Sequence, residues 1–200
     1  MTSPAIGLLE FGSVASGIVA ADAMVKRAPI EQLIAGSVQP GRYLVLVAGD
    51  VASVDEACEA GREAAPAALV DEIVLHDVHV GVVSALRGER VSGSVEALGI
   101  LETASVAPLL AAADAGLKGA EVELLEINIA DGLGGKAYLL FGGAVSDVEA
   151  AVSLGRDRVD PASLVGAEVI AQLHGEMSAN LTDHARFAVR LGREGDDAAG

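Results

Sequence analysis

Two short clusters hold the residue types that could do chemistry in this chain of 200 residues. The segment 76–79 contains two histidines and an aspartate, the ligand types of a metal site. Three such residues on one short segment are a weak signal, and we interpret them as structural. The glycine-rich run 132–136 ends in a lysine and looks like a phosphate loop. A Walker A motif requires glycine at 130 and serine or threonine at 137, and both are alanine.

No arrangement of residues in the sequence predicts catalysis. The chain lacks the G-x-S-x-G nucleophile motif, the H-E-x-x-H zinc motif and a Rossmann glycine motif after a strand. Cys58 is the only cysteine, and it falls within a predicted helix, so we interpret it as a core residue. We therefore expect no catalytic residues, no metal and no enzymatic activity.

Charge and hydropathy exclude two classes of partner. The chain has 29 acidic and 13 basic residues, a net charge of -16, and no basic cluster of the kind that binds nucleic acid. No charge-free run exceeds 11 residues, whereas a membrane-spanning helix needs about 20. The start of the chain lacks the basic region of a secretory signal, and a single cysteine fits a reducing compartment. We expect a cytoplasmic protein that binds neither nucleic acid nor membranes.

The elements that must position any site are repeated, because the sequence is an internal duplication. Residues 5–28 and 97–120 are identical at 13 of 24 aligned positions, where unrelated alanine-rich segments share roughly 2 or 3. The match continues to His79 and His174, with the offset growing from 92 to 95. This repeat predicts that the chain consists of two homologous domains.

Each copy is expected to have the element order β-α-β-β-α-β, the ferredoxin-like pattern of α/β (α+β) folds. The strands expected in the first copy are Ile6–Phe11, Ile30–Ala35, Arg42–Val47 and Leu69–Leu75, and the helices are Ser16–Ala28, Val51–Ala65 and a short one after His79. The predicted domains are 1–90 and 95–186, followed by an acidic, flexible tail at 187–200. The turn at residues 37–41 is expected to be two residues shorter than its counterpart near 131–135.

The repeated motifs resemble those of a bacterial microcompartment shell domain. The residues that carry the resemblance are 6–10 with 22–28, and 98–102 with 114–120 repeat it. The resemblance covers about residues 4–185, nearly the whole chain. The strand-first order is similar to that of the non-permuted tandem-domain shell proteins, the single-layer trimers of the propanediol-utilisation type.

That resemblance implies a structural role rather than turnover. Such proteins form homotrimers that mimic a hexamer and tile with hexameric and pentameric shell proteins into a facet, here in the cytoplasm. Small metabolites would pass through a central pore, whose lining carries over to Ser37, Val38 and Gln39 of the first domain and to Gly132, Leu133 and Gly134 of the second. Lys26 and Lys118 match the family's edge lysine, which lies between neighbouring tiles.

The chain departs from the family pattern in two places. Some trimeric relatives hold an iron–sulfur cluster through a cysteine just before Pro-Gly, and Gln39 occupies that position here. We therefore expect no cluster. The basic residue that usually precedes Pro-His near each domain's end is also absent, so edge packing is expected to differ in detail.

Two questions stay open from the sequence. Gln39 could offer amide groups to a passing solute or be a simple exposed turn residue. Leu133 could form an apolar constriction or pack inward. The alternative function, from another class, is a trimeric small-molecule-binding or regulatory module of ferredoxin-like fold with clefts between subunits. A tile grows in two dimensions, whereas such a module stays a discrete trimer.

Overall fold

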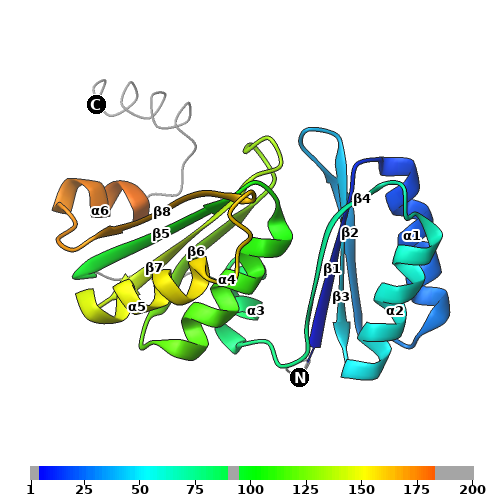
Figure 1. Ribbon diagram of the computed structural model, residues 1–200, viewed down its shortest axis with the longest axis horizontal. Helices are drawn as coiled ribbons and strands as arrows, with labels where there is room; N and C mark the ends of the chain where they lie inside the picture. The colour runs from blue at the N-terminus through cyan, green and yellow to red at the C-terminus, as the bar shows by residue number, and fades with distance from the viewer. Residues whose placement is uncertain (1–4, 90–94, 183–200) are drawn as a thin grey trace, which may run out of the picture.

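A computed structural model describes residues 5–89 and 95–182 of the chain (Figure 1). The first half contains β1 (Ala5–Phe11), α1 (Val14–Arg27), β2 (Gln32–Val38), β3 (Arg42–Gly49), α2 (Val51–Ala64), β4 (Leu69–Leu75) and α3 (Val80–Leu86). The second half contains β5 (Ala97–Thr103), α4 (Val106–Gly119), β6 (Glu123–Ile129), β7 (Ala137–Gly143), α5 (Val145–Arg156), β8 (Leu164–Ile170) and α6 (Gly175–Thr182). The predicted fold class and element order are confirmed in both halves. The predicted tail at 187–200 lies outside the described residues.

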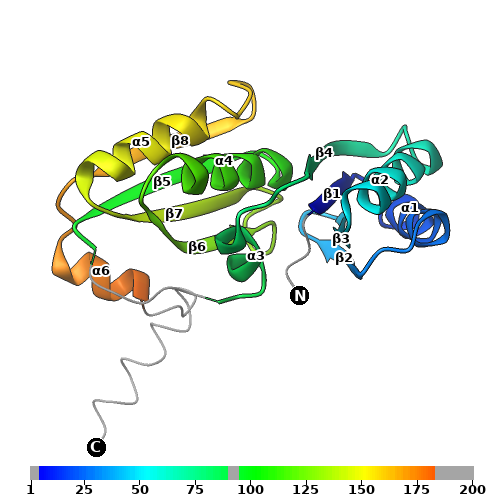
Figure 2. The same ribbon diagram turned by 90° about the horizontal axis from the view of Figure 1, so that it is seen from below.

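Each half folds into a four-stranded antiparallel sheet. The strand orders are β2-β3-β1-β4 and β6-β7-β5-β8, so the same topology occurs twice. Helices α1 and α2 cover one face of the first sheet, and α4 and α5 cover one face of the second (Figure 1). Figure 2 places α6 on the opposite side of the second sheet from α4 and α5.

Alternation along the strands divides the first sheet between two cores. Leu9 and Val45 belong to a cluster with Met24 and Cys58, which come from α1 and α2. Leu8, the neighbour of Leu9, belongs instead to a larger cluster that includes residues of α3 and of the second domain. Successive side chains point to opposite faces of a strand, so one sheet joins the two clusters.

The helices begin at residues that cap their free N–H groups. The Ser13 side chain accepts the N–H of Ser16, so α1 begins at Val14, two residues before the predicted start. At the start of α2, the Asp50 carboxylate accepts the hydroxyl of Ser53 at 2.6 Å and its N–H at 3.0 Å. These two hydrogen bonds lower the pKa of the Asp50 carboxyl, and the one from the hydroxyl has the larger effect.

The second strand is placed differently from the prediction. Ser37 and Val38, expected in the turn, belong to β2 and pair with Tyr43 and Arg42 of β3. The connection therefore shrinks to residues 39–41, while the corresponding connection in the second domain runs from 130 to 136. The second turn is longer, as predicted.

Candidate functional site

The two turns predicted to line a pore lie together at one end of the molecule. Figure 1 shows the β2–β3 and β6–β7 connections at the top, between the two sheets. A Cβ atom placed on Gly135 would lie 3.2 Å from Cδ of Pro40 and 3.1 Å from Nη1 of Arg42. The fold thus brings together residues that lie almost 100 positions apart in the sequence.

The second turn requires its glycines. Gly132, Gly134 and Gly135 have φ angles of 75°, 65° and 88°, in the left-handed region that side chains disfavour. Within this turn Leu133 is half-buried, and its N–H donates to the carbonyl of Ala130 at 3.2 Å. Of the other predicted lining residues, Val38 is half-buried, and the exposed ones are Ser37, Gln39, Gly132 and Gly134.

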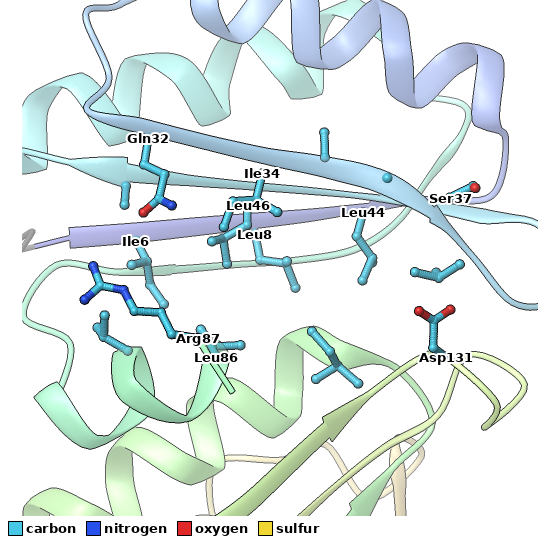
Figure 3. A pocket seen from close by; sticks show the side chains of 16 residues that line it. Ile6, Leu8, Gln32, Ile34, Ser37, Leu44, Leu46, Leu86, Arg87 and Asp131 are labelled. Atoms are coloured by element: carbon cyan, nitrogen blue, oxygen red, sulfur yellow. The ribbon is translucent and has the colours of Figure 1, made fainter. Parts of the chain in front are cut away.

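A cavity of about 290 Å³ lies next to the turns, between the first sheet, α3 and the end of β6 (Figure 3). Its walls are mainly apolar and include Leu8, Ile34 and Leu46. Figure 3 shows Gln32 and Arg87 at one end of the cavity and Ser37 and Asp131 at the other. The cavity is therefore an apolar space with polar ends.

The two domains meet at an interface that we call the domain seam, in which β1, β4 and α3 of the first domain contact α4 and β6 of the second. Glu10 is completely buried there. Its carboxylate accepts Nη1 of Arg42 and, at 3.1 Å, the N–H of Val106 at the start of α4. A negative charge at a helix N-terminus is stabilising. The Ser105 hydroxyl donates to Asp71 of β4 in the same region.

A second polar cluster joins the domains farther along the same helix. Asp114, 7% exposed, accepts the N–H of His79 and Nζ of Lys118, each at 2.7 Å. Lys118 also donates to the carbonyl of Asp77 in the first domain. The structure therefore places the predicted edge residue Lys118 across the domain seam, with its side chain 41% exposed.

Lys26, the other predicted edge residue, lies on the surface of α1. Its Nζ atom is 2.5 Å from the carboxylate of Asp22, and the two side chains are 72% and 59% exposed. The structure does not bring Lys26 and Lys118 together, because they lie in the last turns of α1 and α4, two helices that do not contact each other.

The histidines of the segment 76–79 take separate structural roles. His76 pairs through Nε2 with Asp55 at 2.8 Å, and Nδ1 of His79 accepts the N–H of Gly81 to cap α3. Among the described residues no group of three metal-ligating side chains is present.

Cys58 is buried in α2, and this burial raises the pKa of its thiol to about 12. No helix in residues 5–89 and 95–182 is long and apolar enough to span a membrane.

Comparison with known proteins identifies the same two repeats. The family model described as the BMC domain matches the chain twice, at residues 5–78 and 97–173. The chain belongs to the BMC-domain family. The bacterial microcompartment shell protein PduT of Citrobacter freundii is 39% identical over 176 residues, which cover 88% of this chain and 96% of that protein.

Further BMC-domain proteins agree with this assignment. The crystal structure of a microcompartment protein from Desulfitobacterium hafniense superposes with a TM-score of 0.77 at 40% identity, covering 88% of this chain and 98% of that one. The major carboxysome shell protein CsoS1A of Halothiobacillus neapolitanus is 39% identical over 83 residues, 40% of this chain and 83% of that protein. The predicted family and shell role are confirmed. These relatives indicate a structural rather than an enzymatic role and do not favour the ligand-binding alternative.

Sequence reasoning missed the buried contacts of the domain seam in this BMC-domain protein. The one available signal was Glu10, an acidic residue inside an otherwise apolar strand that recurs as Glu102 in the second copy. A charge at such a position requires a hydrogen-bonding or oppositely charged partner, but the sequence alone does not identify which residue that partner is.

Proposed function

We propose that this shell protein assembles head-to-tail into a homotrimer that mimics a hexamer and tiles into a shell facet. The observation that carries the proposal is a difference between two duplicated helices. In α4, Val106 and Leu110 are fully buried in the cluster that includes residues of the first domain, whereas their counterparts in α1, Val14 and Ile18, are 37% and 52% exposed.

The chain therefore carries both halves of a second interface. One half is α1, which matches the buried helix α4. The other is the sheet of the second domain, where Ile170 is 38% exposed while its counterpart Leu75 packs against the shared core. An interface between two different surfaces of one chain closes into a ring when the rotation allows it. We call this contact the subunit joint. The number three follows the tandem-domain shell proteins that the chain resembles.

In the proposed trimer the six turns surround a central opening. Ser37, Val38 and Gln39 would alternate around it with Gly132, Leu133 and Gly134, and small metabolites would pass through. The two turns lie next to each other in the folded chain, and this proximity supports the arrangement. Gln39 at the cysteine position implies that the trimer holds no iron–sulfur cluster.

Contacts outside the trimer complete the proposal. Lys26 and Lys118 would reach neighbouring tiles, since both side chains keep exposed surface. The partners would be the hexameric and pentameric shell proteins of the same compartment.

Replacing Ile18 by aspartate tests the subunit joint. The wild-type chain, at 20.1 kDa, should sediment as a particle of about 60 kDa, the mass of three chains. The Ile18→Asp chain should sediment as a monomer, because a charge would be buried in an apolar contact. The control is Val51→Glu, a 38% exposed position at the start of α2 where the helix tolerates an acid. A trimer that survives Ile18→Asp would contradict the proposed joint.

A permeation assay on intact shells tests the pore. Gln39→Ala and Leu133→Ala should each change the rate at which a small polar metabolite crosses the shell. Because these residues lie in turns, neither substitution should change trimer assembly. Unchanged permeation with both substitutions would exclude these turns as the path.

A further inference from the structure

The pair Asp22–Lys26 duplicates a pair that already joins two domains. In the domain seam, Asp114 accepts the backbone N–H of His79 and the ammonium group of Lys118, each at 2.7 Å. Lys118 also donates to the carbonyl of Asp77. One carboxylate and one ammonium group of α4 thereby hold the segment that follows β4.

The first domain presents the same two groups at an open surface. Asp22 and Lys26 align with Asp114 and Lys118 at the offset of 92 residues. The Asp22 side chain is 59% exposed, against 10% for Asp114. This difference matches the exposure of Ile18 on the same helix, so α1 differs from α4 in its polar contacts as well as in its apolar ones.

The complementary segment also occurs twice. Gln172 and His174 follow β8 as Asp77 and His79 follow β4, at an offset of 95. His174 has the same local structure as His79, because its Nδ1 accepts the N–H of Glu176 at 3.2 Å as that of His79 accepts the N–H of Gly81 at 3.1 Å. Gln172 and His174 are both exposed. The chain thus holds a second copy of the segment that Asp114 and Lys118 bind.

We propose that Asp22 and Lys26 are the docking site for residues 172–174 of another copy of this chain. The Asp22 carboxylate accepts the backbone N–H of His174 of the partner subunit, and Lys26 donates to the carbonyl of Gln172 of the partner subunit. This inference rests on the proposed head-to-tail trimer and assigns the polar contacts of its subunit joint. Lys118 stays 41% exposed while making the equivalent contact, so Lys26 can dock the segment and still reach a neighbouring tile.

The trimer amplifies the loss of this contact. Removing the carboxylate is expected to weaken each subunit joint about tenfold, the low end for a hydrogen bond to a charged group. A closed trimer has three joints, so its overall association constant falls about 10³-fold. Because three chains form one particle, the concentration at half-dissociation rises with the square root of that factor, about 30-fold.

Sedimentation over a dilution series of wild type and Asp22→Ala tests the docking site. The variant should dissociate at about 30-fold higher concentration, and hydrogen exchange at the His174 amide should be protected in the wild-type trimer but not in the variant. The control is Asp55→Ala, which removes another exposed carboxylate, hydrogen-bonded to His76, from α2. Circular dichroism checks that all three chains fold.

The outcomes separate the two proposals. A wild-type chain that stays monomeric overturns the trimer itself. A wild-type trimer whose dissociation and His174 exchange are unchanged by Asp22→Ala overturns the docking site alone. An equal loss of assembly in Asp55→Ala also overturns it, because the effect would then come from surface charge in general.

Discussion

Replacing Glu10 by alanine should destabilise the folded chain far more than removing any exposed acid. The Glu10 side chain is fully buried, and it accepts hydrogen bonds from Arg42 and from the buried N–H of Val106. Breaking a buried ion pair costs about 3–5 kcal/mol. The Arg42 side chain keeps 26% of its surface exposed and can be hydrated, so we expect a loss at the low end, about 3 kcal/mol.

Urea unfolding measures this loss. With a denaturant slope of about 2–3 kcal/mol per molar, 3 kcal/mol lowers the urea midpoint by about 1–1.5 M. The control Asp55→Ala removes a carboxylate that is hydrogen-bonded to His76, with both side chains at least half exposed. It should lower the unfolding free energy by no more than about 1 kcal/mol. All chains are compared at one protein concentration, because assembly adds to apparent stability. Equal midpoint shifts for the two variants would refute the argument that burial at the domain seam sets the cost.

Three further predictions concern packing and pH. In Gly7→Ala the new Cβ would lie 2.2 Å from Sγ of Cys58, so thermal unfolding should show a loss of about 1–3 kcal/mol, whereas Gly36→Ala, with nothing within 4 Å, should change stability by less than about 0.5 kcal/mol. The pKa of Cys58 rises from 9.0 to about 12 on folding, so the unfolded chain loses the thiol proton first. The stability from this group is complete below pH 9 and is lost as the pH rises toward 12, and urea midpoints should fall less steeply over this range in Cys58→Ala. Leu110→Ala should lower the unfolding free energy by about 2–5 kcal/mol, whereas Ile18→Ala, at the exposed counterpart, should mainly weaken the proposed trimer, as measured by sedimentation.

The sequence was enough to predict the order and the type of the elements, because local chemistry determines them. Leu69–Leu75 has the predicted bounds, as a strand that is apolar at both ends and lies between a helix-ending proline and a polar segment. The duplication supplied the domain count without any tertiary information. It also assigned the two turns to equivalent positions, which the structure brings to one end of the molecule.

The strand bounds and residue environments that the sequence did not predict depend on tertiary contacts. Ser37 and Val38 belong to a strand because β3 lies beside them, which the local sequence does not reveal. The different environments of Ile18 and Leu110 are equally hidden, since both are large aliphatic residues at the same helix position. The identical acids Glu10 and Glu102 differ for the same reason: one faces a second domain within the chain, and the other is half-exposed.

The shared core affects the order and the ratio in which the two domains enter any assembly of this protein. Leu8 of the first domain and Leu109 of the second belong to one buried cluster, so noncovalent packing holds the two domains in a fixed order. The peptide chain adds a fixed ratio, one of each domain per molecule. In the proposed trimer, two domains made as separate chains could form mixed rings in any order, whereas a fused pair would permit only strict alternation. The proline-containing turn and the glycine-rich turn can therefore diverge independently, and in the proposed ring each change would appear at every second position.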